Sequence, residues 1–291
     1  MMGFQSLALA LFGKIADKYA DSFEPLKYAL PKADIKVPLR TYLSVMLLVT
    51  FLVYFVTLVL TIFLVVYFFK LQLFLAIAYS LFIPFLAAAG VFLWYVFYPF
   101  QRAMIRKRNI EANLPFVITH MSSIADAGIP PSAIFHLISA FKEYGEVTKE
   151  LSKIARNMEQ FGMDPVRAIR EVADRTPSEE LRELLLGIVT TTESGGDIKL
   201  FLRTMGEQAL FEWRIRRERF LQQMSTYAEF YVGVIIAAPL FLIALFAIMG
   251  LIQPSIAGYS IIDITKLGIY LLIPAINLGF LFFLRTIEVE I

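Results

Sequence analysis

Residues 41–69 read TYLSVMLLVTFLVYFVTLVLTIFLVVYFF and contain no Asp, Glu, Lys, Arg or His. A helix needs about 20 apolar residues to cross the hydrocarbon core of a bilayer, and this run exceeds that length. Three more uncharged runs follow, at residues 71–100, 230–252 and 267–284. The sequence therefore predicts an all-α, polytopic membrane protein in which four transmembrane helices form two hairpins around a polar segment.

The polar segment and the chain ends complete a division into five parts. We expect an amphipathic and juxtamembrane segment, a first hairpin, a helical domain, a second hairpin and a short tail at residues 1–40, 41–100, 101–229, 230–284 and 285–291. The helical domain contains 18 Lys or Arg and 18 Asp or Glu. This balance argues against a nucleic-acid partner, which would require a basic excess. The chain has no cysteine, which excludes disulfides, thiolate catalysis and cysteine-ligated zinc.

Basic residues are distributed unequally around the predicted spans, and such residues accumulate on the cytoplasmic side of membrane proteins. With four spans, both termini and the helical domain lie on one side. The basic residues near the spans on that side are Lys36, Arg40, Arg102, Arg106, Lys107, Arg108, Arg214, Arg216, Arg217, Arg219 and Arg285. The opposite side carries only Lys70 and Lys266. We therefore expect both termini and the helical domain in the cytoplasm of a multi-pass protein of the cell (inner) membrane.

Glycine and proline divide the helical domain into segments with helical periodicity. Pro115 is expected to limit the start of a helix that ends at Gly128, and Pro130 opens the next helix. Repeated apolar residues at helical spacing continue through the rest of the domain. The sequence predicts a cytoplasmic bundle of about six helices and no strands.

Three further sequence features predict where helices begin and continue in the second half of the bundle. Asp164 before Pro165 is typical of a helix N-cap, and Thr176 before Pro177 predicts another capped start. No glycine or proline occurs between Glu207 and Val232. We therefore expect one continuous helix from about Ile198 into the third span.

Motifs for catalysis or cofactor binding are missing from the sequence. It contains no G-x-x-x-x-G-K-[ST], H-E-x-x-H or G-x-S-x-G run. His120 and His136 fall on different predicted helices, and a lone histidine on a helix is far more often a packed or surface residue than a metal ligand. The residues therefore give no candidate for a catalytic, cofactor-binding or metal-binding site.

Five short motifs occur in order between the two hairpins. They are Leu114-Pro115, Ala127-Gly128-Ile129-Pro130, Phe161-Gly162-Met163-Asp164-Pro165, Arg175-Thr176-Pro177-Ser178 and Glu193-Ser194-Gly195-Gly196-Asp197. Together with the flanking spans, this order resembles the type II secretion system F domain family, over residues 101–252. The family comprises inner-membrane platform proteins of type II secretion, type IV pili, Tad pili and archaella. The chain is most similar to the shorter Tad-type or archaeal members, because it carries one such domain where several branches carry two.

The resemblance implies a mechanical function without catalysis. A cytoplasmic secretion ATPase would dock beneath the platform, and its motion would pass to pilin-like subunits in the membrane. Because only one domain is present, the resemblance also implies a homo-oligomer or a paralogous platform subunit. The chain would thus couple the ATPase to the insertion or extraction of pilins.

Two features have both a structural and a functional interpretation. The first is the set of basic residues beside spans two and three, which would either dock the ATPase or anchor the spans in lipid head groups: Arg102, Arg106, Lys107, Arg108, Arg214, Arg216, Arg217 and Arg219. The second is the turn from Glu193 through Ser194, Gly195 and Gly196 to Asp197. It would either provide the positive φ that a glycine turn requires or form a tip that contacts a partner.

Two other classes of function stay open on the residues alone. A transporter or channel component is one alternative, although the spans lack the ionisable residues that ion-coupled transport normally uses. A membrane-anchored signalling adaptor is the other, in which the helical bundle binds a cytosolic partner.

Overall fold

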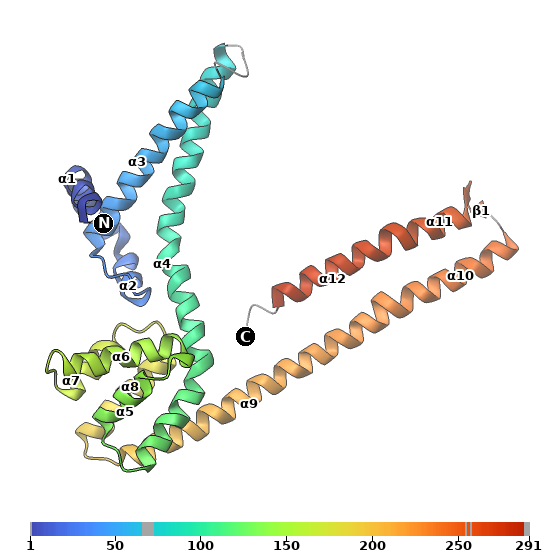
Figure 1. The fold of residues 1–291 in the computed structure, drawn as a ribbon. Helices are drawn as coiled ribbons and strands as arrows, with labels where there is room; N and C mark the ends of the chain where they lie inside the picture. Colours follow the sequence, from blue (N-terminus) through green and yellow to red (C-terminus); the bar gives the residue numbers. More distant parts are fainter. Residues whose placement is uncertain (1, 66–72, 254, 257, 288–291) are drawn as a thin grey trace. The chain divides into compact units, whose positions relative to one another are not determined.

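The structure is a computed structural model that describes the chain except for residues 1, 66–72, 254, 257 and 288–291 (Figure 1). The chain forms two compact units, Met1–Gly206 and Glu207–Ile291. The border falls inside helix α9 (Ile198–Phe230), which begins in the first unit and continues into the second. The first membrane hairpin therefore belongs to the same unit as the core of the helical domain.

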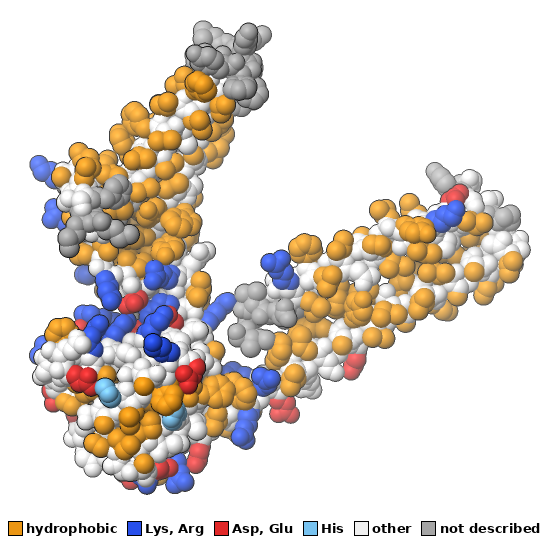
Figure 2. Space-filling model, in the orientation of Figure 1, with side chains coloured by type: hydrophobic (Ala, Val, Ile, Leu, Met, Phe, Trp, Pro, Cys, Tyr) orange, Lys and Arg blue, Asp and Glu red, His pale blue; other side chains and the backbone are white. Residues whose placement is uncertain are grey.

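Four helices among the described residues are long and apolar enough to cross a membrane, as the sequence predicts. In the first unit, α3 (Leu39–Leu64) packs along the first half of α4 (Leu73–Asp126). Figure 2 shows hydrophobic side chains covering this hairpin, whereas the charged side chains of the unit gather over the helical domain. The turn expected at Lys70 lies outside the described residues.

One predicted helix boundary is wrong, because α4 continues through it. Pro115 was expected at the start of a helix, but it lies inside α4, as do Pro84 and Pro99. A proline inside a helix removes one backbone hydrogen bond. Burial on both sides of Pro115 outweighs this loss, because Ile110, Leu114, Val117, Ile118 and Met121 are all in the core. A single helix thus runs from the membrane to the far end of the domain.

A helical segment before the first span packs against the hairpin. Helix α1 (Met2–Tyr19) lies along α3, the 3₁₀ turn η1 (Ala20–Phe23) follows, and α2 (Glu24–Lys32) lies along α4. The expected apolar face of α1 is exposed at Leu7, Leu11 and Ile15, while Ala8 and Ala16 are buried. Small side chains and Phe12, whose ring centroid lies 5.9 Å from that of Phe51, therefore make the contact with the hairpin.

A hydrogen bond joins the two spans of this hairpin at a proline. The Tyr42 hydroxyl donates to the Tyr95 carbonyl oxygen, with 2.7 Å between the oxygens. Pro99 stands four residues after Tyr95 and has no N–H to donate to this carbonyl. Tyr42 supplies the missing donor.

The remaining helices of the first unit stack on the end of α4. They are α5 (Pro131–Ser139), the 3₁₀ turn η3 (Lys142–Tyr144), α6 (Glu146–Glu159), α7 (Pro165–Ala173) and α8 (Glu179–Glu193). With α4 and the start of α9 they form the expected six-helix bundle. Fully buried side chains such as Phe135, Leu151, Leu181 and Leu184 form its core.

The second unit contains the second hairpin. After α9, the π-helical segment η4 (Tyr231–Ala237) leads into α10 (Ala238–Ile252). The helices α11 (Ile261–Leu267) and α12 (Ile273–Ile287) return, with the π-helical segment η5 (Gly268–Leu272) between them. Each π-helical segment directly precedes a proline near a helix start, Pro239 or Pro274. The loop contains a two-residue antiparallel ladder, β1 (Ser255–Ile256) with β2 (Tyr259–Ser260), where no strand was expected.

Candidate functional site

Four of the five predicted motifs lie at helix ends of the bundle, whereas Leu114-Pro115 lies inside α4. Gly128, Gly162 and Gly195 have φ angles of 78°, 60° and 68°. This left-handed conformation strains residues that carry a Cβ atom, so glycine is favoured at each turn. Pro130 is in extended conformation directly before α5, as expected from its position.

Aspartates cap two helices of the bundle, Asp164 as predicted and Asp197 at the end of the predicted glycine turn. The Asp164 carboxylate accepts hydrogen bonds from the backbone N–H groups of Val166 and Arg167 at the start of α7. The Asp197 carboxylate accepts from Lys199 N at 2.9 Å and from Leu200 N at 3.2 Å. Both side chains thus satisfy N–H groups that have no partner within their helix.

The predicted N-cap of α8 is wrong. Thr176 was expected to cap this helix, but Ser178 occupies the N-cap and its hydroxyl accepts from Leu181 N at 3.3 Å. Thr176 instead accepts from Ser178 N at 3.4 Å. The helix therefore begins two residues later, and the threonine stabilises the turn that precedes it.

The turn from Glu193 to Asp197 has internal contacts that explain several of its residues. Arg170 on α7 donates from one nitrogen to both carboxylate oxygens of Glu193, at 2.8 Å each. A Cβ atom on Gly196 would lie 3.0 Å from the Thr191 methyl group. The Ser194 hydroxyl donates to the Thr191 carbonyl at 3.2 Å. The turn geometry accounts for these residues, and a partner contact is an additional proposal.

Arg106 differs from the other seven basic candidates because it is buried, at 5% exposure. Its guanidinium pairs with Glu146 at 2.8 Å and with Glu150, both on α6. It also donates to the Lys32 carbonyl at the end of α2, at 2.6 Å. The expectation that Arg106 docks a partner or anchors lipid is corrected, since its charge is used inside the protein to join α2, α4 and α6.

The ion-pair cluster continues toward the loop before the first span. Lys153 on α6 lies 2.8 Å from an Asp34 carboxylate oxygen and 3.0 Å from Glu150. Partial burial alone would raise the pKa of Asp34, but the hydrogen bond and charge of Lys153 outweigh it and hold that pKa below its usual range. Burial alone would likewise raise the pKa of Glu146, but the hydrogen bonds and charges of Lys149 and Arg106 outweigh this effect. The pKa of Glu146 is therefore also lowered. Both carboxylates are therefore held in their charged form.

The other basic candidates are at least partly exposed and fall in two groups. In the first unit, Arg102 donates to the Tyr98 hydroxyl at 3.2 Å, and Lys107 lies 3.7 Å from Glu111. Arg108 is exposed. In the second unit, the exposed group consists of Arg214, Arg216, Arg217 and Arg219 on α9. Arg217 also lies over the Trp213 ring, 5.4 Å from its centroid.

Both histidines have close neighbours. His120 Nδ1 lies 3.2 Å from the Tyr144 hydroxyl, and the ring meets Phe141 edge to face. His136 Nδ1 lies 2.7 Å from a Glu159 oxygen. Across the described residues, no group of three or more His, Cys, Asp or Glu is arranged to hold a metal.

Comparisons with known proteins point to one family. Residues 117–246 match the profile described as type II secretion system (T2SS), protein F. An uncharacterised protein of Methanocaldococcus jannaschii is 26% identical over 189 residues, which are 64% of this chain and 32% of that protein. The flagella accessory proteins J of Methanococcus voltae and of M. jannaschii are 24% and 23% identical, over 60% of this chain and 30% of each relative.

The chain thus spans about a third of the length of these relatives, as the covered shares of 32% and 30% show. No solved structure matches the chain. The matched residues extend from α4 through the bundle into α10. They include four of the five motifs in full, and they lie next to the fifth, at Leu114 and Pro115.

Proposed function

We propose that this chain, which carries a type II secretion system F domain at residues 117–246, is a non-enzymatic platform protein of a type IV filament or type II secretion machine. The observation that carries the proposal is that the match joins the helical bundle to the third span in one continuous region. Two similar proteins named flagella accessory protein J support a filament rather than a transport function. The chain would couple a cytoplasmic secretion ATPase to the insertion or extraction of pilin-like subunits.

A gene deletion tests this function directly. In the source organism, loss of the chain should abolish a surface filament or the export of a pilin-like protein. The full chain should restore it, whereas a variant with Leu184→Asp in the bundle core should not. A deletion strain with normal filaments and normal secretion would contradict the proposal.

The proposed orientation places the bundle in the cytoplasm, and the lack of cysteine makes it easy to test. Lys142→Cys and Ser255→Cys introduce single thiols at exposed positions of the bundle and of the loop between α10 and α11. A membrane-impermeant maleimide should label Ser255→Cys in intact cells and Lys142→Cys only after permeabilisation. The reverse pattern would invert the topology and rule out docking of a cytoplasmic ATPase on the bundle.

The arginines of α9 are the stronger candidates for the ATPase contact. Arg219 and Arg214 precede Phe230 by 11 and 16 residues, which is about 16 Å and 24 Å along a helix. The head-group layer on each side of a bilayer is only about 6 Å thick. Lipid anchoring therefore explains Arg102, two residues after Phe100, better than it explains Arg214.

A charge-reversal experiment separates docking from anchoring. The double variant Arg214→Glu and Arg219→Glu should lose binding of the ATPase in a pull-down while inserting normally into membranes. The charge-retaining double variant Arg214→Lys and Arg219→Lys is the matched control and should bind. Unchanged binding by the glutamate variant, or loss of insertion without loss of binding, would refute docking at α9.

Partners in the membrane are proposed from the second hairpin. None of the most apolar 18 residues of Ile261–Thr286 is buried, and only 6% of the corresponding window of Ile198–Ile252 is. This exposed surface is available to lipid, to pilin-like subunits, or to a second copy or paralogue of the chain. Cross-links from Leu245→Cys to a pilin-like protein or to another copy would identify which one it contacts.

A further inference from the structure

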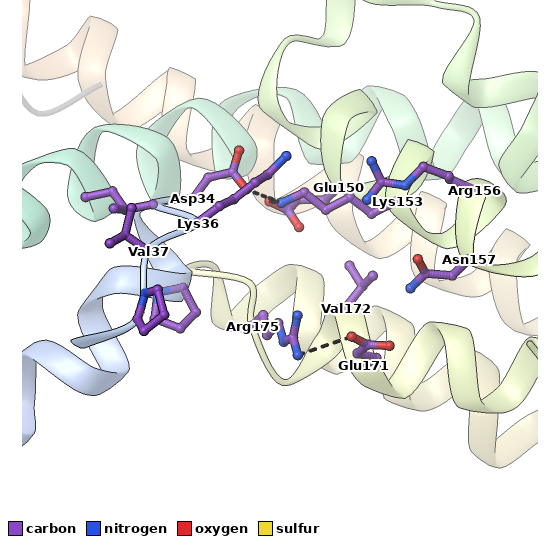
Figure 3. A pocket seen from close by; sticks show the side chains of 13 residues that line it. Asp34, Lys36, Val37, Glu150, Lys153, Arg156, Asn157, Glu171, Val172 and Arg175 are labelled. Atoms are coloured by element: carbon purple, nitrogen blue, oxygen red, sulfur yellow. Dashed lines mark hydrogen bonds and ion pairs between the residues drawn. The ribbon is translucent and has the colours of Figure 1, made fainter. Parts of the chain in front are cut away.

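A cavity of about 660 Å³ lies in the first unit between the loop before α3 and the helices α6 and α7. Its volume is within the range of small-molecule sites in proteins, about 300–1,000 Å³. Figure 3 shows the loop on one side, with Asp34, Lys36 and Val37, and the helices on the other, with Arg156, Asn157 and Arg175. The platform function uses none of these residues.

The cavity has an excess of positive charge that its own carboxylates do not neutralise. Lys153 pairs with Asp34 and Glu150, and Glu150 also pairs with buried Arg106. Arg175 lies 3.2 Å from Glu171. Within the part of the chain that the structure describes, no carboxylate is within ion-pair distance of the two remaining cations, Lys36 and Arg156.

A polar side chain inside the cavity also lacks a partner. Asn157 is only 8% exposed, and its carboxamide is directed into the cavity (Figure 3). No hydrogen bond of this carboxamide is found among the described residues, and its polar atoms are open to the cavity, since Asn157 is not among the residues with a fully buried unpaired atom. Lys36, Arg156 and Asn157 together offer the donors that a phosphate group would accept from.

The position of the cavity selects the kind of anion. Pro38 lines it and is the residue directly before α3, so the cavity lies next to the N-terminal end of the first span. Pro31, Ile35 and Val37 add an apolar edge on the same side. We infer that the cavity binds the head group of an anionic phospholipid from the leaflet next to the helical bundle, with the acyl chains passing the apolar edge toward α3.

The test uses the purified full chain in a zwitterionic detergent with short-chain phosphatidylglycerol as the probe. Phosphatidylcholine tests for a head group without net charge, and inorganic phosphate and glycerol phosphate test for a free anion. Binding is read from native mass spectra and from the rise in the thermal unfolding midpoint. We expect phosphatidylglycerol to bind with one-to-one stoichiometry and to stabilise the chain, whereas the other three should do neither at the same concentration.

Three variants test the residues. Lys36→Gln and Arg156→Gln should each weaken phosphatidylglycerol binding about fivefold, the effect of one basic residue near anionic lipid. Lys142→Gln and Arg167→Gln remove exposed cations elsewhere on the bundle and are the matched controls. Asn157→Ala removes no charge, so a weaker complex with this variant distinguishes the cavity from general attraction to an anionic surface.

Each result supports or overturns the inference. Unfolding midpoints without lipid should stay close to wild type for Lys36→Gln and Arg156→Gln, because neither cation is within ion-pair distance of a carboxylate and Lys36 acts on Asp34 only at longer range. Equal binding of phosphatidylcholine and phosphatidylglycerol, or equal binding by the controls and the cavity variants, would overturn the lipid site. Equal stabilisation by inorganic phosphate would replace the lipid with a soluble anion.

Discussion

The two membrane hairpins are similar in amino-acid composition but differ in how they pack against the rest of the chain. Tyr42, Leu43 and Met46 of the first hairpin are buried in a cluster with Leu26 and Leu30 of α2 and Ala16 of α1. In the second hairpin, between α10 and α12, large side chains such as Phe241 and Leu242 are 70% and 47% exposed. The interior contact that stands out there is the hydrogen bond from the Tyr231 hydroxyl to Asn277 Oδ1, at 2.9 Å.

The comparison teaches that the two hairpins suit different tasks. The first is packed against α1 and α2 by apolar side chains, and the buried cluster around Arg106 joins α2 and α4 to α6 of the bundle. Both hairpins leave most of their apolar surface exposed, since 11% of the most apolar window is buried in each span of the first hairpin and 6% and 0% in the spans of the second. The buried contacts that distinguish the first hairpin lie against α1 and α2. On the proposed platform function, we expect the first hairpin to form the fixed base and the second to contact the filament subunit.

The two tryptophans allow each unit to be followed separately. Trp94 lies on α4 in the first unit and Trp213 on α9 in the second, and the chain has no other tryptophan. Trp213→Phe leaves a probe of the first unit, and Trp94→Phe leaves a probe of the second. Denaturation in mixed micelles with SDS then gives an unfolding free energy from each probe.

The largest expected effect breaks the buried cluster of the first unit. Arg106→Met removes the guanidinium that pairs with Glu150, whose side chain is only 2% exposed. Breaking a buried ion pair costs about 3–5 kcal/mol of stability. The Trp94 probe should report this loss, and the Trp213 probe should report little change. Arg102→Met is the control, because Arg102 is exposed.

Restoring part of the loss sharpens the same test. Arg106→Met combined with Glu150→Met removes both buried charges and should recover stability relative to the single variant. If Arg106→Met destabilises no more than Arg102→Met, the cluster does not hold the first unit together.

Truncation of one leucine in each hairpin tests the difference in packing. Leu43→Ala opens a cavity at a position with 1% exposure and should cost about 2–4 kcal/mol by the Trp94 probe. Leu242→Ala removes a side chain that lipid tails replace equally well, so its cost should stay below about 1 kcal/mol by the Trp213 probe. Equal losses at the two positions would mean that the second hairpin is packed as tightly as the first.

Acid should weaken the first unit selectively. Asp34 and Glu146 have lowered pKa values in the folded chain, below the ordinary 3.8 and 4.5. Their stabilisation is therefore complete above those ordinary values and is lost as the pH falls through the folded pKa values. Between about pH 6 and about pH 3, the Trp94 midpoint should fall in wild type and fall less in Lys153→Met. A pH slope that is identical in wild type and Lys153→Met would contradict the assignment for Asp34.

The smallest expected effects come from single hydroxyl groups. Tyr231→Phe removes the hydrogen bond to Asn277 and should cost about 0.6 kcal/mol, the average for such bonds between membrane helices. Tyr42→Phe should cost more, about 1–3 kcal/mol, because it leaves the Tyr95 carbonyl without a donor. The ranking of these two variants, each read by the probe of its own unit, is the measurement. A larger loss for Tyr231→Phe would reverse the comparison of the hairpins.

Local sequence was enough to predict the spans, the bundle and most helix ends. An uncharged run of 20 or more residues, a glycine at positive φ or an aspartate before a proline acts through its immediate neighbours. Pro115 failed as a boundary because the buried residues around it come into contact with helices far away in the sequence. The start of α8 was displaced by two residues because Thr176 and Ser178 are both good caps, and only the position of the preceding turn decides between them.

The candidate residues show the same limit. Arg106 reads as one of four basic residues after the second span, and nothing near it in the sequence marks it as buried. Its partners Glu146, Glu150 and Lys32 are 40, 44 and 74 residues away. The cavity beside α3 was missed for the same reason, since its cations Lys36 and Arg156 are brought together only by the fold. A usable signal was the segment with two prolines and two lysines that ends α2 and leads into α3, at Pro31, Lys32, Lys36 and Pro38.

The contact between Tyr42 and the carbonyl exposed by Pro99 has a consequence for how this chain can diverge. Although the two residues are on different helices, we expect them to vary together. Among homologues, proline at position 99 should be accompanied by a side chain with a hydroxyl at position 42. Lineages that replace the proline are released from that requirement, and phenylalanine at 42 should appear in them first.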